Sequence, residues 1–299
     1  MATTRLPPRP CNIALPMNPV RENPGVADLW SGNAVVGGIA RRYYTGWVEA
    51  PFSVKGVRSG IGVWKTDGRE FAVGPDAFML VNEGQRYELT IESAAFVHTK
   101  CLFFDPKLIA DVAGSFAARR LLDPPAPKQR EFSNALRPRD GAIQNLLETS
   151  RPLTEDDFVH AAEFLVAGEQ ERAFALERLA LVNGTSRADI FLRLERSADL
   201  MIEGAGQRLS LDRIAKESDL SPYHFHRLFR AAYKVTPLEF LTEQRLRRAR
   251  RLLMTTDLDL DSICLSIGLE SASSFSRLFK RRFGQSPGRY RNSQDRTEI

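Results

Sequence analysis

The chain has 299 residues, of which 43% are hydrophobic and 26% charged, with a formal net charge of +5 at pH 7. This length allows two domains. The sequence has no apolar run of 18 residues and no N-terminal segment in which a charged stretch precedes an apolar one, so we expect neither a membrane span nor a secretion signal. Cys11, Cys101 and Cys264 are far apart and lack metal-ligand spacing, so a soluble cytoplasmic protein is expected.

The positive charge is concentrated toward the C-terminus. From Asn183 onward the chain carries 21 Lys and Arg against 15 Asp and Glu, whereas the preceding residues carry 21 and 22. A basic excess confined to one part indicates that this part alone meets a polyanion such as nucleic acid. We therefore expect two domains with different partners.

The N-terminal half is expected to be rich in β-structure. Residues 1–24 contain six prolines and no apolar periodicity, which predicts a flexible arm. From Val26 to Asp105 the chain shows short runs of β-branched and aromatic residues, separated by turn signals at 66–69, 74–76 and 82–85. Short, closely spaced strands predict a small barrel or sandwich.

A small-molecule site in such a domain would combine aromatic walls with a few polar groups. The candidate effector-binding residues, each of which could equally be an ordinary core or surface residue, are Tyr43, Trp47, Trp64, Arg86 and Tyr87. His98 is the histidine of this region, and one imidazole does not make a three-ligand metal site. We therefore expect His98 to be a strand or pocket residue, and we expect no metal and no other cofactor.

Helical periodicity follows from Asp140 to Val182, with a break at Arg151-Pro152. Thr154 is a candidate N-cap. The apolar positions of the second helical segment are Phe158, Ala161, Ala162, Leu165, Leu176, Leu179 and Ala180. Two helices packed as a hairpin are predicted, then a linker over 183–188, then a helix whose buried side is Ile190, Leu194, Ala198 and Met201.

The C-terminal part contains an internal repeat. Arg227-Leu-Phe-x₃-Tyr-x₃-Pro-x₂-Phe240 recurs fifty residues later as Arg277-Leu-Phe-x₃-Phe-x₃-Pro-x₂-Tyr290, and Ile214-Ala-x₄-Leu220 recurs as Ile263-Cys-x₄-Leu269. A repeat of this length indicates a duplicated supersecondary unit. Each copy is predicted to be a short helix, a tight turn and a second helix.

The second helix of each copy has one apolar and one polar stripe. The apolar stripes are Phe225, Leu228, Phe229 and Tyr233 in the first copy and Phe275, Leu278, Phe279 and Phe283 in the second. The outward stripes are Tyr223, His226, Arg227 and Arg230, then Ser273, Ser276, Arg277 and Lys280. Neither outward stripe contains a carboxylate, as a surface that approaches DNA phosphates requires, and such a helix can enter a major groove.

Local signals mark where these helices begin. Ser221-Pro222 and Ser286-Pro287 place an N-cap before a proline, and Thr236 with Glu239 forms a capping box. The capping box predicts a helix through about Leu253 that joins the two copies rigidly. Its arginines, which alone would more often indicate a solvated face than a nucleic-acid contact, are Arg245, Arg247, Arg248, Arg250 and Arg251.

Residues Leu209 to Arg291 resemble the double helix-turn-helix domain of AraC/XylS-type bacterial transcription regulators. The second copy carries the family signature from Asp259 to Arg291, with Cys264 and Leu269 as apolar replacements for alanine and an aromatic residue. The resemblance implies that certain positions face bases and phosphates: Tyr223, His226, Arg227, Ser273, Ser274, Ser276 and Arg277. It also implies that the two helices enter successive major grooves roughly 34 Å apart, and the arginine forks suit guanine.

Residues Gly74–Tyr87 resemble the turn and strand of the cupin-like sensor that many such regulators carry. The resemblance implies an α+β protein with two domains: a cupin-like β-barrel with a helical hairpin over 25–182, and an all-α domain with two helix-turn-helix units over 189–299. It further implies a homodimer formed through the hairpin helices, although these helices could instead simply cover the barrel.

The expected function is a sequence-specific transcription regulator that responds to a small-molecule effector. The resemblance favours an activator that contacts RNA polymerase, but the residues do not decide between activation and repression. A constitutive regulator whose N-terminal domain only dimerises is the alternative. A fused enzyme is not expected, because repair-type domains need four zinc-binding cysteines and amidase-like domains need alternating strands and helices.

Overall fold

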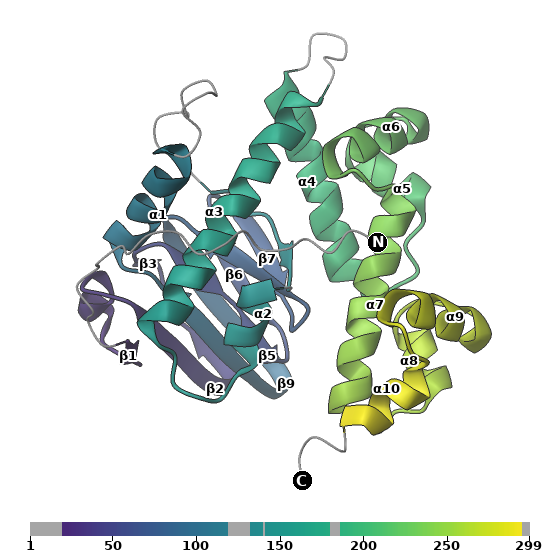
Figure 1. The fold of residues 1–299 in the computed structure, drawn as a ribbon, viewed down its shortest axis with the longest axis horizontal. Coiled ribbons are helices and arrows are strands. Elements are labelled where there is room, and N and C mark those ends of the chain that lie inside the picture. Colours follow the sequence, from purple (N-terminus) through teal and green to yellow (C-terminus); the bar gives the residue numbers. More distant parts are fainter. Residues whose placement is uncertain (1–19, 119–131, 140, 180–185, 295–299) are drawn as a thin grey trace.

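The computed structural model describes residues 20–118, 132–139, 141–179 and 186–294 (Figure 1). Residues 1–19 of the expected arm, with Cys11, lie outside these ranges, as do Asp140, Ala180 and the first three residues of the expected linker. Within the described residues the N-terminal part is β-rich and the C-terminal part is helical, which confirms the mixed architecture expected from the sequence.

The N-terminal part is built around one long strand, β9. The strands are β1 (Arg21–Glu22), β2 (Ala34–Tyr44), β3 (Val48–Glu49), β4 (Ser53–Lys55), β5 (Val57–Ser59), β6 (Gly62–Thr66), β7 (Arg69–Val73), β8 (Ala77–Val81), β9 (Arg86–Phe103) and β10 (Arg137–Pro138). Antiparallel pairing places β2 and β3 along one side of β9, and β4, β5 and β6 along the other. The expected turns form, including Asp67-Gly68 between β6 and β7, where both residues have positive φ.

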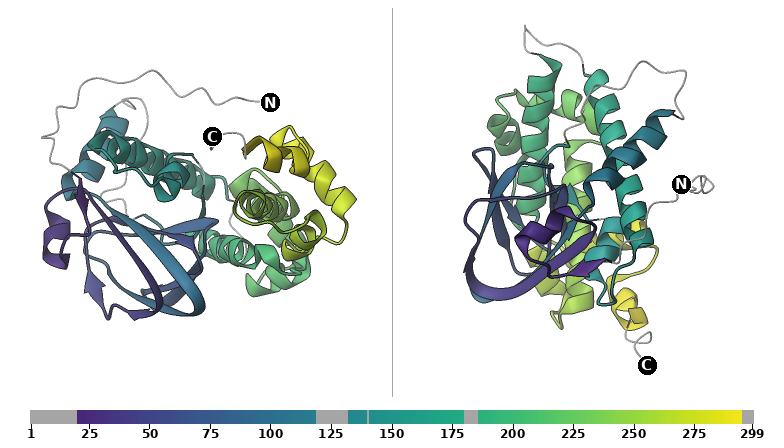
Figure 2. Two further views of the ribbon diagram at one scale, coloured as in Figure 1. Left: turned by 90° about the horizontal axis from the view of Figure 1, so that it is seen from below. Right: turned by 90° about the vertical axis from the view of Figure 1, so that its left-hand side faces the viewer.

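The sheet curls but its strand order stays open. The order runs β1-β2-β9-β4-β8-β10, and the described residues do not pair the first strand with the last. The closed cupin-like barrel that we expected is therefore not confirmed. Figure 2 shows the strong curvature of the sheet and the helices packed against one of its faces.

Strand β8 shows why both faces of the sheet are buried. Its residues alternate between two cores, as the period of two in a strand requires: Ala77, Met79 and Val81 join the core inside the curl, whereas Phe78 and Leu80 join the core under the helices. A strand covered on both faces reads as a continuous apolar run, which is what the sequence shows at these positions.

Three helices of the described ranges cover the outer face: α1 (Pro106–Ala118), α2 (Gly141–Glu148) and α3 (Glu155–Glu177). Thr154 caps α3 with a full capping box, as its position predicted. The apolar stripe of α3, which begins at Phe158 and includes Leu165, packs with Phe104 and its neighbours on the sheet. This part of the stripe is buried against the sheet, whereas Leu176 and Leu179 pack with the helical part of the chain. The helices therefore cover the sheet, and a dimer formed through them stays a prediction.

The C-terminal part consists of seven helices among the described residues: α4 (Arg187–Glu203), α5 (Leu211–Glu217), α6 (Pro222–Tyr233), α7 (Pro237–Thr255), α8 (Leu260–Ser266), α9 (Ala272–Phe283) and α10 (Pro287–Gln294). Two 3₁₀ turns, η1 (Val26–Trp30) and η2 (Gly204–Gly206), complete the elements. Helix α7 packs against α4 and α6 and also against α8, α9 and α10, so it joins the two copies of the repeat.

The two parts of the chain are held together by partly buried ion pairs. Arg251 of α7 donates two hydrogen bonds to the Asp76 carboxylate, at 2.8 and 2.7 Å. Arg69 of β7 donates to Asp199 of α4 at 2.9 Å, and the same carboxylate accepts from the backbone N–H of Leu136 at 2.7 Å. Burial raises the pKa of Asp199 to about 7 despite the Arg69 guanidinium beside it.

Apolar and backbone contacts extend this junction. Ile202 of α4 is buried in the core inside the curl of the sheet, and Phe240 of α7 packs against that core. Arg247 of α7 donates to the carbonyl of Arg139 at 3.0 Å, and Glu203 accepts from the N–H of Ala72 at 3.2 Å. The interior of the sheet and the helical part are therefore in direct contact.

Candidate nucleic-acid interface

The first repeat unit is the helix-turn-helix pair α5 and α6. Ser221 begins α6 by accepting from the N–H of His224, and Pro222 occupies the first helical turn, as the sequence predicted. Asp219 takes a positive φ of 51° in the turn before it, and Lys234 ends α6 in the left-handed region. The pair buries Phe225 and its apolar stripe against α4 and α7.

The second unit, α8 and α9, repeats this geometry with glycines at the two strained positions. Asp259 caps α8 and Ser271 caps α9. Gly268 takes a φ of 69° in the turn and Gly284 a φ of 82° at the end of α9. Glycine adopts such angles without steric cost, so the second copy meets the demands of the motif more completely than the first.

The outward stripes lie on the surface, where the helical wheel placed them. In α6, Tyr223, His226, Arg227 and Arg230 are exposed, Tyr223 to 74%. In α9, Ser273, Arg277 and Lys280 are exposed and Ser274 and Ser276 are half-buried. Figure 1 shows both helices on the side of α7 that faces away from the sheet. The two helices that carry the candidate residues therefore lie on the same side of α7.

The cations of the two stripes make no direct ion pair among the described residues, although the pKa of the Glu239 carboxyl at the start of α7 is lowered by its capping-box hydrogen bonds and, to a smaller extent, by the charge of Arg230. Arg227, Arg230, Arg277 and Lys280 form no ion pair there and make no hydrogen bond to a carboxylate. Among the described residues, the positive charges of Arg227, Arg277 and Lys280 are therefore not directly paired, so phosphates can approach them.

The arginines of α7 behave differently, and neither interpretation from the sequence describes them. Arg251 pairs with Asp76 and Arg247 contacts Arg139, so both tie α7 to the N-terminal part. Arg245 donates to the carbonyl of Gln207 at 3.0 Å and is nearly buried. Arg250 lies over the ring of Phe283. These side chains hold the structure together rather than forming a solvated face or an interface with nucleic acid.

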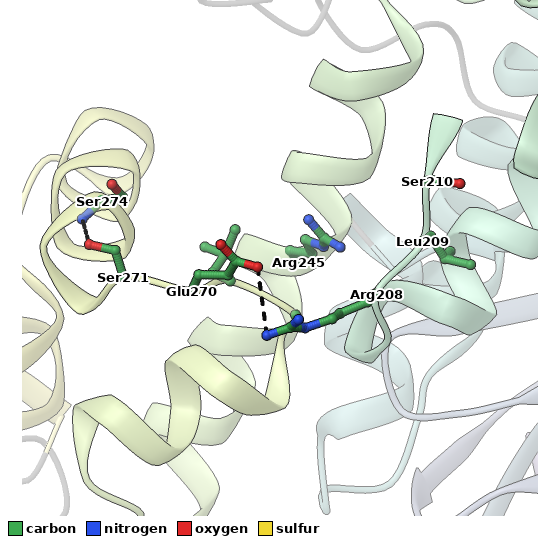
Figure 3. Close-up of a pocket in the computed structure, with 9 residues that line it drawn as sticks. Arg208, Leu209, Ser210, Arg245, Glu270, Ser271 and Ser274 are labelled. Carbon is green, nitrogen blue, oxygen red and sulfur yellow. Dashed lines mark hydrogen bonds and ion pairs between the residues drawn. The ribbon is translucent and has the colours of Figure 1, made fainter. Parts of the chain in front are cut away.

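A shallow depression of about 530 Å³ lies between the two units (Figure 3). Ser210 at the start of α5 and Ser271 and Ser274 at the start of α9 lie on its sides, and Arg245 of α7 contributes to its lining. An ion pair of 3.6 Å between Arg208 and Glu270 crosses it. The lining of the depression comes from the start of the first unit, from α7 and from the second unit, so it marks the boundary between the two units.

Gly268 offers a test of the second unit. A Cβ added there would lie 2.6 Å from the carbonyl oxygen of Gln207 in a left-handed backbone, whereas a Cβ on Gly284 would meet nothing within 4 Å. We expect Gly268→Ala to cost about 2–4 kcal/mol of stability and Gly284→Ala only about 1 kcal/mol. Urea unfolding followed by helical circular dichroism measures both, and equal losses would contradict the steric argument.

The candidate effector residues do not form one pocket. Trp64 and Tyr87 are buried inside the curl of the sheet. Tyr43 and Trp47 are exposed, Trp47 to 45%, and the guanidinium of Arg86 lies 5.9 Å from the Trp47 ring. His98 is half-buried and lines a separate surface depression of about 360 Å³. Two of the five residues therefore share the interior, and the other three lie outside it.

Sequence reasoning missed two polar residues of that interior. Ser53 and Lys55 lie two residues apart on β4, both are fully buried, and burial lowers the pKa of Lys55 to about 7. The alternation of side chains between the two faces of a strand could have identified these residues. Val54 faces the helices, so its neighbours on either side must face the interior of the curl.

Within the described ranges, no helix is long and apolar enough to cross a membrane.

Comparison with known proteins places the C-terminal part among bacterial regulators. A family model described as a helix-turn-helix domain matches residues 214–293. The regulatory protein SoxS of Salmonella typhimurium is 34% identical over 90 residues, which cover 30% of this chain and 84% of SoxS. The arabinose operon regulatory protein of Escherichia coli is 24% identical over 264 residues, 84% of this chain and 86% of that protein.

The match to the bifunctional transcriptional activator and DNA repair enzyme AdaA of Bacillus subtilis is shorter. It has 33% identity over 85 residues, 28% of this chain and 40% of AdaA. The chain also spans well under half the length of several other relatives that it matches.

Proposed function

Because the chain belongs to the AraC/XylS family of transcription regulators and carries a DNA-binding helix-turn-helix domain, we propose that it activates transcription in response to a small molecule held by its N-terminal part. The observation that supports this proposal most directly is the pair of matched outward stripes on α6 and α9. Their cations are exposed and make no direct ion pair among the described residues, and the two helices that carry them lie on one side of α7.

In this proposal α6 and α9 enter successive major grooves on one face of the duplex, about one helical turn apart. Arg227 and Arg277 pair with guanine O6 and N7. The other proposed contacts, to bases or phosphates, come from Tyr223, His226, Arg230, Ser273, Ser274, Ser276 and Lys280. The rigid connection through α7 supports a fixed spacing, since one helix packs against both units.

The junction between the two parts supports a coupling between effector and DNA. A ligand shifts an equilibrium only if it interacts differently with two arrangements of the protein. Ile202 lies in the core inside the curl of the sheet, and Asp199, one helical turn earlier in α4, pairs with Arg69 of β7. A change in that interior would therefore act directly on α4, which packs against α5, α6 and α7.

We further propose a homodimer and a contact with RNA polymerase, as in the regulators that the sequence resembles. The apolar stripe of α3 is buried against the sheet from Phe158 to Leu165 and packs with the helical part at Leu176, so a dimer would have to use other residues of these helices or the sheet itself. Sedimentation velocity of the full chain reports the oligomeric state, and a monomer at micromolar concentration would remove the dimer from the proposal.

Fluorescence anisotropy of the full chain with promoter DNA flanking its own gene tests the function. We expect tight binding that falls steeply with salt, because each phosphate contact releases counterions, and much weaker binding to a scrambled duplex. Equal affinity for both duplexes would contradict sequence-specific regulation. Specific binding that no small molecule alters would instead favour a constitutive regulator whose N-terminal part only dimerises.

A further inference from the structure

Two hydrogen-bonding groups point into the interior of the curled sheet without a partner. The Nζ of Lys55 and the Oγ of Ser53 are fully buried and make no hydrogen bond within the described part of the chain. Both belong to β4 and face the same side, since residues two apart share a face of a strand. Buried polar groups are normally satisfied, so two adjacent exceptions indicate that something else provides the acceptor.

The surroundings of Lys55 are aromatic and apolar. Its Nζ lies 3.7 Å from the centre of the Tyr87 ring and 4.0 Å from that of Phe103. Trp64 and Met79 belong to the same core, and no carboxylate among the described residues pairs with this ammonium. The ring faces attract a cation but accept no strong hydrogen bond. The buried Cys101 thiol also acts on Lys55, but burial raises the pKa of this thiol, so no carboxylate or other full negative charge among the described residues compensates the ammonium at neutral pH.

The ammonium of Lys55 and the hydroxyl of Ser53 limit the chemical class of ligand that can satisfy both groups. A cation and a hydroxyl on one strand face are met by a group with a single negative charge and two acceptor oxygens, which describes a carboxylate. A phosphate dianion would carry a second charge into an apolar core at a large desolvation cost. A neutral amide would satisfy hydrogen bonds but leave the ammonium unpaired. Tyr87 and Phe103 suit a hydrocarbon body attached to the carboxylate.

We propose that the interior of the curled sheet binds a small organic monocarboxylate, whose oxygens accept from Lys55 Nζ and Ser53 Oγ and whose body packs against Tyr87 and Phe103. The inference rests on the proposed function in one respect: it names the class of effector that the N-terminal part senses. Binding would favour the charged form of Lys55, whose pKa burial now lowers to about 7. Ile202 of α4 borders the same core, which gives the ligand a route to the helical part.

Thermal unfolding of the full chain tests the site with butyrate as the probe and butyramide as its neutral control, at constant ionic strength. Acetate and hexanoate extend the series in length. We expect the melting temperature of the wild type to rise with butyrate and not with butyramide. Lys55→Met should abolish the rise, and Ser53→Ala should weaken butyrate binding about three- to tenfold.

Lys100→Met is the matched control, because Lys100 of β9 is half-buried and donates to the carbonyl of Thr149 at 2.7 Å. It should respond to butyrate like the wild type. The proposal is overturned if Lys55→Met keeps the response, or if no carboxylate of the series stabilises the wild type more than butyramide does.

Fluorescence anisotropy with DNA, measured with and without butyrate, distinguishes a failure of the carboxylate site from a failure of the proposed sensing function. If butyrate stabilises the protein through Lys55 but leaves its DNA affinity unchanged, the carboxylate site stands and the sensing function fails. If DNA affinity changes with butyrate equally in the wild type and in Lys55→Met, the effector acts elsewhere and the site fails.

Discussion

Replacing both Arg227 and Arg277 by alanine is expected to weaken specific DNA binding by about 2–6 kcal/mol, since each arginine that pairs with a guanine contributes about 1–3 kcal/mol. Both side chains are exposed and make no ion pair among the described residues, so the substitutions remove a contact with DNA and no internal one. Each single variant should lose part of the affinity and relax sequence preference at its own half-site. Fluorescence anisotropy with specific and scrambled duplexes measures both effects.

Arg42→Ala is the matched control for this experiment. Arg42 is an exposed arginine of β2 in the N-terminal part, remote in sequence from both recognition helices. It should bind DNA like the wild type, and all these variants should keep the wild-type melting temperature. Full affinity in the double variant would show that α6 and α9 are not the recognition helices.

Lys55→Met is expected to raise the free energy of unfolding by about 2–4 kcal/mol at pH 7 in buffer without carboxylates. A buried, uncompensated ammonium costs more than an apolar side chain of similar volume. Burial lowers the pKa of Lys55 from 10.5 to about 7 in the folded state, while the Cys101 thiol acts weakly in the opposite direction. The neighbouring Tyr87 has a raised pKa and stays neutral throughout this range.

The sign of the pH dependence follows from these values. Between pH 7 and 10.5 the unfolded chain binds more protons at this position than the folded chain, so wild-type stability rises with pH. The difference in free energy of unfolding between Lys55→Met and the wild type should therefore be largest below pH 7 and should shrink as pH approaches 10.5.

Urea unfolding followed by tryptophan fluorescence measures this difference, because Trp30, Trp47 and Trp64 all lie in the N-terminal part. Lys100→Met, whose parent ammonium has a carbonyl acceptor, should show no such gain. If Lys55→Met proves less stable than the wild type at pH 7, the contacts of the ammonium with Tyr87 and Phe103 outweigh the cost of burying its charge.

The helical part of the fold follows from its sequence because its signals are local. The caps at Ser221 and Thr236 and the apolar stripes lie within single helices, and packing of those stripes decides which side chains reach the surface. The repeat then assigns the same roles to both copies. The orientation of Arg227 and Arg277 was predictable for this reason, whereas their contacts with DNA remain a prediction.

The N-terminal part was less predictable because its structure depends on pairing between distant strands. Turn signals located the hairpin at Asp67-Gly68, but β9 pairs with five other strands and no local pattern gives that register. The two cores on either side of β8, and hence the burial of Lys55, follow from this pairing. The contact between Arg251 and Asp76 joins residues from different parts of the chain and has no local signal.

If α6 and α9 read one duplex together, hydroxyl-radical footprinting will detect both helices on a site selected from random DNA by the full chain. We predict two protected segments on one face of the duplex, about 10 base pairs apart. Arg227→Ala should weaken protection of one segment and Arg277→Ala that of the other. A single protected segment, or one that both substitutions weaken equally, would show that α6 and α9 do not each bind their own major groove.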